Sequence, residues 1–240
     1  MFQQLQAAAP DAILGLNEAF ANDTTDGKIN LTTGVYKDAS GTTPVLACVK
    51  EAERRLVETE ATKGYLGIDG MKEFGDAARG LLFGADHEIT TSGRTATIQA
   101  PGGTGALRVA AEFLATAFPE AKIWCSRPTW ANHPGIFSAA GLQVAEYDYY
   151  DAATGTLDAQ ALIDSLANIP AGDIVCLHAC CHNPTGVDPT PEQWQELSRV
   201  VSEGGLLPLV DFAYQGFGDG LESDAAGLRA LAGPDCRLLV

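Results

Sequence analysis

Short runs with the character of a β-strand alternate with helical patterns along most of this chain. The runs that have the length of a β-strand span residues 96–99, 122–125, 143–147, 173–179, 206–210 and 237–240. This alternation predicts an α/β fold with a mostly parallel sheet and helices on both faces. In such a sheet, ligands bind outside the carboxyl ends of the strands, so residues that follow the runs are the first candidates for a site.

The helical patterns indicate the domain organisation. The expected helices span 44–60, 104–118, 134–140, 158–166, 191–202 and 225–231. In the second of these, Leu107, Ala110, Ala111 and Leu114 have the spacing of an inward face. We expect residues 1–43 to form an N-terminal arm with a strand-and-turn unit, and residues 44–240 to form one large domain.

Composition and charge limit the classes of partner. Apolar residues make up 46% of the 240 positions, which is typical of a packed globular protein. The formal net charge of −16 argues against nucleic acid, which requires a basic surface, and against an anionic membrane. No apolar run approaches the ~20 residues of a membrane span, and Met1–Leu5 shows no signal-peptide features. We therefore expect a cytoplasmic protein.

The cysteines indicate the same compartment. They are Cys48, Cys125, Cys176, Cys180, Cys181 and Cys236. Their spacing shows no disulfide framework and most lie in apolar segments, so we expect reduced core residues. Cys176, His178, Cys180 and His182 alternate along an extended stretch and could share a face. A zinc site needs a second ligand pair at suitable spacing, and none appears, so we predict no metal.

A glycine-rich turn is the candidate anion site. Gly102-Gly103-Thr104-Gly105 lies between an expected strand and an expected helix. Glycines let the backbone approach an anion closely, and a helix N-terminus offers free N–H groups with partial positive charge. A tight strand-to-helix turn is the alternative. The run matches neither the P-loop nor the dinucleotide fingerprint, so neither of those nucleotide sites is predicted.

Three polar or aromatic residues follow other strands. Trp130 could stack on a flat heteroaromatic ligand, although a single loop Trp is more often a packing residue. His133 is weak evidence, because a lone His is often only a polar residue at a helix start. Asn183 could donate its amide to a ligand oxygen, and the alternative is an Asn-Pro turn with Pro184.

Asp211 is the most informative single residue. It follows the apolar run 206–210 and should be substantially buried at the carboxyl end of that strand. Buried carboxylates need a cation or hydrogen-bond donor, and a protonated pyridine nitrogen is such a partner. Tyr214 could reach an oxygen on the same ring. The alternative, a helix cap or turn, does not explain the burial.

Taken together, these motifs resemble the class I, fold-type I aminotransferases that use pyridoxal phosphate, specifically the aspartate and aromatic branch. The matching stretches are Asn30–Asp38, Tyr65–Gly70, Pro101–Arg108, Cys180–Gly186 and Asp211–Phe217. Jointly they are highly specific and cover nearly the whole chain. The resemblance implies a large cofactor-binding domain preceded by part of a small domain, in a homodimer that acts on amino acids and 2-oxo acids.

The resemblance also implies a role for each matching residue. Gly103 and Thr104 would hold the cofactor phosphate, with Tyr65 reaching it from the other subunit. The remaining cofactor contacts would come from Trp130 on the ring face, His133 behind it, Asn183 and Tyr214 at the ring oxygen, and Asp211 at the ring nitrogen. Gly34, Trp130 and Asn183 would border the substrate carboxylate.

Several family residues have no match here: the Schiff-base lysine, the arginines that bind the two carboxylates of the substrate, and a phosphate-binding arginine. The Schiff-base lysine of the family lies just beyond the strand that corresponds to Arg237–Val240, where this chain ends. We therefore expect the N-terminal part of an aminotransferase, inactive by itself. A short protein that binds ligand or pairs with a full-length subunit without catalysis is the alternative. We favour aspartate as the substrate, from Tyr65–Gly70 and Gly103-Thr104, with aromatic amino acids as the other candidate.

Overall fold

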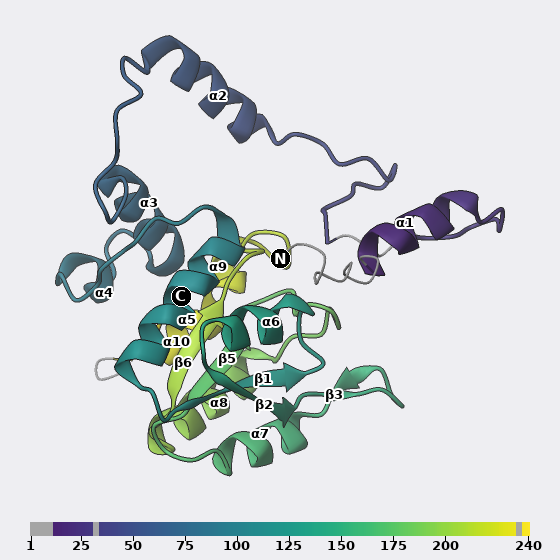
Figure 1. Cartoon of the computed structure of the whole chain (residues 1–240), viewed down its shortest axis with the longest axis vertical. Helices are drawn as coiled ribbons and strands as arrows, with labels where there is room; N and C mark the ends of the chain where they lie inside the picture. The colour runs from purple at the N-terminus through teal and green to yellow at the C-terminus, as the bar shows by residue number, and fades with distance from the viewer. Residues whose placement is uncertain (1–11, 31–33, 234–236) are drawn as a thin grey trace, which may run out of the picture. The chain divides into compact units, whose positions relative to one another are not determined.

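The computed structural model describes residues 12–30, 34–233 and 237–240 (Figure 1). The chain divides into two compact units, with the boundary between Lys63 and Gly64. The expected division into domains at residue 43 therefore stays a prediction. Within the described residues, no helix has the length and apolar character needed to cross a membrane.

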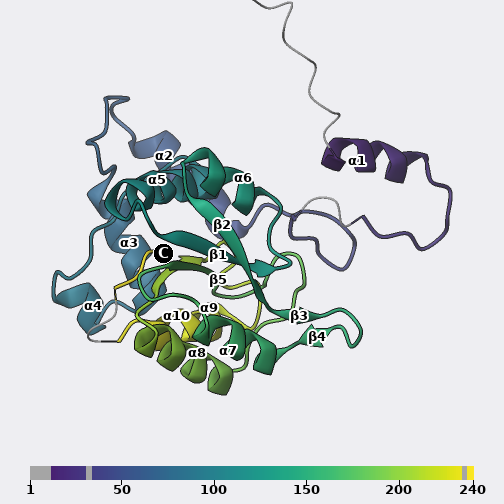
Figure 2. The same cartoon turned by 60° about the horizontal axis from the view of Figure 1, so that its bottom comes forward.

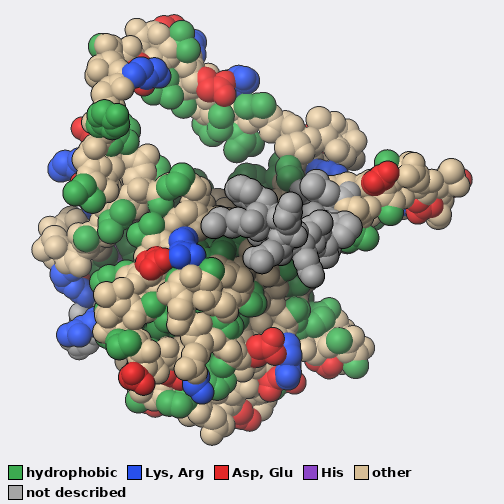
Figure 3. Space-filling model, in the orientation of Figure 1, with side chains coloured by type: hydrophobic (Ala, Val, Ile, Leu, Met, Phe, Trp, Pro, Cys, Tyr) green, Lys and Arg blue, Asp and Glu red, His purple; other side chains and the backbone are tan. Residues whose placement is uncertain are grey.

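The first unit contains α1 (Ala12–Asn22) and α2 (Ala47–Thr59), and α2 confirms the helix expected over 44–60. No residue of α2 is buried. Hydrophobic side chains are exposed beside its charged ones (Figure 3). Cys48 is one of these exposed residues, so the expectation that it belongs to the core was wrong. The reason is that the described part of its unit buries none of the apolar side chains of α2.

The second unit is built around a four-stranded sheet in the order β2-β1-β5-β6. Its strands are β1 (Lys122–Arg127), β2 (Gln143–Asp148), β5 (Ile174–His178) and β6 (Leu207–Asp211), and all three pairings are parallel. Figure 2 shows α5 (Gly102–Ala117) and α6 (Asn132–Ala139) on one face, with α7 (Ala159–Ala167) and α8 (Pro191–Glu203) on the other. The expected fold class is thus confirmed.

Side chains of β5 alternate between two hydrophobic cores, one on each face of the sheet. Ile174 and Cys176 join the core that contains Leu114 of α5. Val175 and Leu177 join the core on the opposite face, among the inner residues of α7 and α8. Because successive residues of a strand point to opposite faces, a strand covered on both sides must be apolar throughout. All five residues of β5 are buried.

The helices begin and end close to the expected positions. α5, α6, α7, α8 and α10 (Ala226–Leu231) correspond to the helices expected from residue 104 onward. Asp158 caps α7 by accepting a hydrogen bond from the backbone of Ala161. Thr190 begins α8 with a reciprocal capping box to Gln193. Such caps satisfy N–H groups that the first helical turn leaves unpaired, which explains why these boundaries are readable from sequence.

Two expected strands did not form as such. Residues 96–99 pair with no strand among the described residues. Gln99 donates its backbone N–H to the Asp69 carbonyl, and the Thr97 hydroxyl accepts a hydrogen bond from Arg79. Their hydrogen bonds therefore go to the segment 69–79. The run 237–240 makes a single parallel bridge, between Leu239 and Leu209. The neighbouring Pro208 lacks an N–H to donate, which limits a ladder on this side of β6.

The sequence patterns did not predict the other described elements. These are α1, α3 (Lys72–Phe83), α4 (Glu88–Thr91), the antiparallel pair β3 (Tyr150–Asp151) and β4 (Thr156–Leu157), and α9 (Leu221–Asp224). Expectations that fall on residues 31–33 and on Cys236 lie outside the described residues.

The contact between α10 and α8 offers a test of this packing. A methyl group at Gly227 would lie 2.4 Å from the indole ring of Trp194. We expect Gly227→Ala to lower the free energy of unfolding by about 1–3 kcal/mol, the usual cost of overpacking. Gly80 in α3 is the matched control, because a Cβ there meets no atom within 4 Å. Gly80→Ala should stabilise by about 0.5–1 kcal/mol. If the two variants unfolded at the same urea concentration, the close contact between Gly227 and Trp194 would be contradicted.

Candidate active site

A pocket of about 220 Å³ opens at the carboxyl end of the sheet. The volume is several times the share of one water molecule, about 30 Å³, so a ligand of several heavy atoms fits. Its lining residues are Gly103, Thr104, Leu107, Trp130, His178, Cys180, Asn183, Asp211, Ala213 and Tyr214. They come from four separate stretches of the chain, which the parallel sheet brings together.

Strand order determines where the pocket forms. The connection from β1 leads to β2 on one side, whereas β5 and β6 lie on the other side of β1. The sheet order therefore reverses beside β1, and such a point leaves a crevice outside the carboxyl ends of the strands. The loop after β1 carries Trp130, the loop after β5 carries Asn183, and β6 ends at Asp211.

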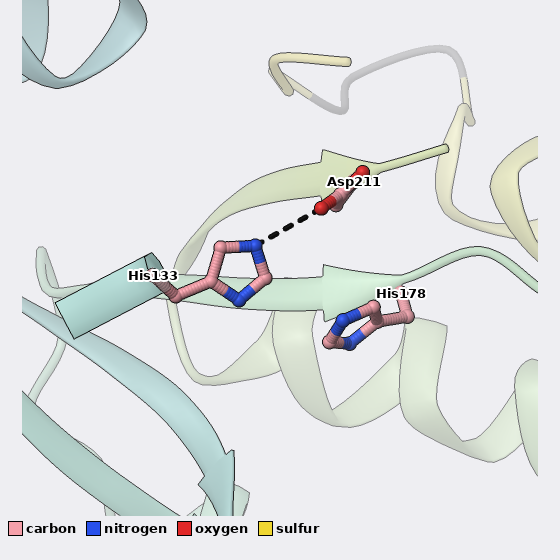
Figure 4. Close-up of side chains that lie close together, drawn as sticks. All are labelled: His133, His178 and Asp211. Atoms are coloured by element: carbon pink, nitrogen blue, oxygen red, sulfur yellow. Dashed lines mark hydrogen bonds and ion pairs between the residues drawn. The ribbon is translucent and has the colours of Figure 1, made fainter. Parts of the chain in front are cut away.

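Asp211 is held by a buried histidine. Its side chain is 18% exposed, and His133 Nε2 donates to its Oδ2 at 2.9 Å (Figure 4). The His133 ring is 0% exposed, and its Nδ1 is bonded to the hydroxyl of Thr129 at 2.8 Å. Trp130 meets the His133 ring edge-on, with centroids 5.3 Å apart. With both ring nitrogens engaged, His133 fixes the direction in which the Asp211 carboxylate faces.

His178 lies beside Asp211 because the two are register partners at the ends of β5 and β6. Its side chain lines the pocket, yet neither ring nitrogen has a hydrogen-bond partner among the described residues. A buried polar group without a partner costs roughly 1–3 kcal/mol. Burial, followed by the neighbouring His133, lowers the pKa of His178 to about 4, so this imidazole is neutral at pH 7.

His182 extends the cluster, which holds three of the four histidines in the chain. Its ring lies 4.3 Å from that of His178 and stacks on Tyr149 at 4.0 Å. Ser126 bonds its Nε2 and Thr185 bonds its Nδ1, at 2.9 and 2.8 Å. Burial, followed by the neighbouring imidazoles, lowers its pKa to about 3.

A carboxylate shapes the loop that presents Asn183. Asp188 accepts hydrogen bonds from the backbone N–H groups of Cys181 and His182, at 2.6 and 2.8 Å. The backbone of Gly186 returns to the His182 carbonyl at 2.7 Å. These bonds hold the loop on both sides of Asn183. The Asn183 side chain lines the pocket and makes no hydrogen bond within the described part of the chain. Its amide is therefore available to a ligand.

The glycine-rich run forms the N-terminus of α5. The helix begins at Gly102, and Pro101 before it provides no side-chain cap. Gly102 adopts φ +70°, a conformation that favours glycine, and a Cβ on Gly103 would meet no atom within 4 Å. The first N–H groups of the helix are thus uncapped and open beside Thr104. This arrangement favours an anion, as expected from the sequence.

Tyr214 follows β6 in a loop that a second carboxylate organises. The buried Asp224 accepts hydrogen bonds from the backbone N–H groups of Gly216, Gly218 and Asp219, at 2.7, 3.0 and 2.8 Å. These bonds lower the pKa of Asp224 despite its burial. The loop in turn is closed by a bond from Phe217 N–H to the Tyr214 carbonyl at 3.0 Å. Tyr214 is therefore attached to a fixed loop.

The structure brings most of the predicted site residues together. Gly103, Thr104, Trp130, Asn183, Asp211 and Tyr214 line one pocket. His133 lies behind Asp211, as the resemblance implied. Tyr65 and Gly34 are not lining residues. Tyr65 is fully exposed, and Gly34 belongs to the first unit. Their expected roles stay predictions.

Sequence reasoning missed four lining residues, namely Leu107, His178, Cys180 and Ala213. A signal existed for two of them. His178 ends the apolar run that forms β5, and Leu107 lies one helical turn after Gly103. His178 was instead weighed with neighbouring cysteines as a zinc ligand. Burial raises the pKa of the Cys180 thiol, so Cys180 contributes a neutral wall.

Comparison with known proteins identifies the family. The model of the family described as aminotransferase class I and II matches residues 26–240. The chain belongs to this family. It is 56% identical over 240 residues to the aspartate aminotransferase of Escherichia coli (strain K12), and 53% identical to that of Haemophilus influenzae. Each match covers the whole chain but only 61% of the relative, so the chain spans about three fifths of these enzymes.

Solved structures of the family have the same fold. An aromatic amino acid aminotransferase from Burkholderia cenocepacia superposes with a TM-score of 0.91 at 48% identity, over 96% of this chain and 58% of that one. The enzyme from Burkholderia pseudomallei gives a TM-score of 0.93 at 44% identity, over 99% and 60%. That structure is covalently bound to pyridoxal phosphate. The resemblance inferred from the sequence motifs is thereby confirmed.

The imidazole cluster predicts how stability depends on pH. The pKa values of His178 and His182 in the folded chain, about 4 and about 3, lie below the ordinary 6.5. As pH falls below 6.5, the unfolded chain binds protons that the folded chain does not. Stability present above pH 6.5 is therefore lost toward pH 4, by about 1.4 kcal/mol per pH unit for each imidazole.

Urea unfolding at several pH values between 7 and 4.5 measures the slope of the unfolding free energy against pH. His178→Gln should reduce the slope by about 1.4 kcal/mol per pH unit, because the glutamine does not titrate. Comparison with the wild-type chain cancels the contribution of carboxylates. Identical slopes for the two proteins would show that His178 is not a neutral buried imidazole in the folded state.

Proposed function

We propose that this chain belongs to an enzyme that moves an amino group between an L-amino acid and a 2-oxo acid with pyridoxal phosphate. Because the chain spans about 61% of its curated relatives, the proposal concerns the whole protein. The observation that carries it is the Asp211 carboxylate, which is held by buried His133 and lines a pocket together with an uncapped helix N-terminus.

The donor set of the pocket fits that cofactor. Pyridoxal phosphate has a phosphate, a protonatable ring nitrogen, a ring oxygen and an aromatic face. The uncapped start of α5 at Gly103 and Thr104 suits the phosphate, and Trp130 offers an aromatic surface for the ring. When bound, the cofactor supplies an electron sink for bond cleavage at the amino acid Cα.

Asp211 would keep the proton on the ring nitrogen. A carboxylate next to a cationic ring nitrogen stabilises the protonated form, and that form is the stronger electron sink. His133 donates to one carboxylate oxygen and holds Asp211 in position. His133 is thus a positioning residue in this proposal.

Asn183 and Tyr214 would bind the ring oxygen. The Asn183 amide and the Tyr214 hydroxyl line the same pocket and can both donate hydrogen bonds there. We propose that Gly34, Trp130 and Asn183 border the substrate carboxylate. Aspartate is the favoured substrate, and the similarity to aspartate aminotransferases of 53–56% identity supports this choice over aromatic amino acids, at 48% for one such relative.

The chain by itself is expected to be inactive. All its lysines are described, and none of them lines the pocket. An aminotransferase binds its cofactor and moves the α-proton through a lysine. This observation also supports the second candidate, a ligand-binding chain without turnover. We further propose a cytoplasmic location, because Cys125, Cys176 and Cys180 are free thiols in the described structure.

A chimaera tests the function. It joins the 240 residues to the part of the E. coli aspartate aminotransferase that the match leaves uncovered. We expect the chimaera to transaminate aspartate, and the chain alone to give no turnover. In the chimaera, Asp211→Ala should lower kcat a hundred-fold or more, because the partner of the ring nitrogen is lost. This corresponds to an activation free energy raised by about 3–5 kcal/mol. Asp211→Glu should be milder, since the charge remains.

Asp173 provides the matched control. Its carboxylate is also buried, but it precedes β5, at the opposite end of that strand from the pocket. It accepts hydrogen bonds from Trp124 Nε1 and the Lys122 backbone, at 2.8 and 3.0 Å. Asp173→Asn should lower the free energy of unfolding by about 1 kcal/mol, the usual contribution of a hydrogen bond to folding. It should leave kcat within about two-fold, because Asp173 lies away from the pocket. A normal kcat for Asp211→Ala would refute the assigned role.

We also propose that the enzyme is a homodimer in which Tyr65 reaches the cofactor phosphate of the partner subunit. Tyr65 and Ile68 are 108% and 104% exposed, in a segment punctuated by glycines. Aromatic and apolar residues are enriched at protein interfaces, and a partner surface would cover them. A second copy of the same chain is the partner that the family resemblance implies.

Mixed dimers test whether the sites are shared. Chimaeras carrying Tyr65→Phe are combined with chimaeras carrying Asp211→Ala. If Tyr65 acts across the interface, one site of each heterodimer carries both changes and the other carries neither. The intact site should then bind pyridoxal phosphate with wild-type affinity, whereas Tyr65→Phe homodimers lose about 0.5–3 kcal/mol. Weakened binding at every site with an intact Asp211 would show that Tyr65 serves its own subunit.

A further inference from the structure

His133, His178 and Asp211 form a cluster of three potential metal ligands. One ligand atom from each, an imidazole nitrogen or a carboxylate oxygen, lies within 4.8 Å of the other two (Figure 4). The three side chains come from α6, β5 and β6, which the sheet holds in fixed positions. Two of them, His178 and Asp211, are register partners on adjacent strands.

His178 independently indicates a ligand. Its side chain is only 7% exposed and lines the pocket, and neither of its nitrogens has a hydrogen-bond partner in the described structure. His182, the next histidine in the cluster, has both nitrogens bonded. His178 therefore presents an unused nitrogen beside the Asp211 carboxylate, where a ligand in the pocket can reach it.

The donor set suits a borderline transition metal. Two imidazoles and one carboxylate are a ligand combination of Zn²⁺ sites that keep a further position open. Among the described residues that line the pocket, there is no lysine or arginine that would repel a cation. The Thr129 hydroxyl can accept a hydrogen bond from Nδ1–H, so the neutral His133 ring can carry its proton on Nδ1 and offer the Nε2 lone pair to a metal. Such a bond to the second nitrogen is usual for a metal-bound histidine.

We propose that His133, His178 and Asp211 bind one divalent transition-metal ion, with Zn²⁺ as the best match, when the cofactor pocket is empty. The remaining coordination position faces the pocket. Under the function proposed above, the cofactor ring nitrogen and the metal require the same Asp211 carboxylate. The two ligands would therefore exclude each other, and free Zn²⁺ would compete with cofactor loading.

Isothermal titration of Zn²⁺ into the cofactor-free 240-residue chain tests the site directly. We expect one strong site, and His178→Asn should weaken it by about 100-fold or more, since losing even an outer partner of a ligand costs about 10–100-fold. The control is His87→Asn, which changes the histidine outside the cluster and keeps a residue able to cap α4. It should leave Zn²⁺ affinity unchanged. Circular dichroism confirms that each variant is folded.

Two further measurements separate this site from its alternatives. Asp211→Asn, a second variant that removes a ligand, should weaken Zn²⁺ binding as strongly as His178→Asn. Co²⁺, used as a spectroscopic substitute, should show ligand-field bands without thiolate-to-metal charge transfer. Unchanged affinity in both variants, or a thiolate band from the cysteines near the pocket, would overturn the proposal.

Competition distinguishes this proposal from the proposed function. Pyridoxal phosphate added before Zn²⁺ should lower the apparent metal affinity in proportion to cofactor occupancy. If Zn²⁺ binds and depends on His178 but pyridoxal phosphate has no effect, the metal site stands and the placement of the cofactor ring at Asp211 fails. If pyridoxal phosphate binds through Asp211 while Zn²⁺ does not bind, the cofactor site stands and the metal site fails.

Discussion

The site depends on one interaction, the hydrogen bond that His133 donates to the partly buried carboxylate of Asp211. Asp211 ends a strand whose preceding residues are buried, so its charge lies where water cannot fully solvate it. His133 supplies the compensating donor, and Thr129 in turn fixes the His133 ring. Because unpaired buried charge is so unfavourable, the loop after β1 and the start of α6 must lie against the end of β6. The pocket lies beside this contact, where α5 and the loop after β5 complete its lining.

The sequence predicted the parts of this arrangement that follow from local chemistry. An almost wholly apolar run predicted β5 as a buried strand, and a carboxylate directly after another buried strand indicated the importance of Asp211. Helix positions followed from apolar residues at helical spacing, and the caps on α7 and α8 account for the close agreement at their starts. The gathering of six predicted residues in one pocket followed from the rule that carboxyl ends of parallel strands meet.

The remainder depends on long-range contacts that no local pattern contains. His133 was weak as a single histidine, and it became central only when β1 and β6 placed Asp211 2.9 Å away. His178 was compared with its neighbours in sequence, whereas its relevant neighbours come from α6 and β6. Residues 96–99 have strand character, but their donors and acceptors found partners in the segment 69–79. The strand propensity of a segment is therefore overridden when the fold offers its backbone and side chains other hydrogen-bond partners.

The alternating side chains of β5 have a consequence for how the second unit unfolds. Ile174 and Cys176 belong to one core, and Val175 and Leu177 to the other, so the strand is a shared wall. Removal of either helical layer would expose one side of this wall to water and weaken the contacts that hold the opposite layer. The two layers should therefore melt as one cooperative body, and local opening should be confined to segments outside both cores.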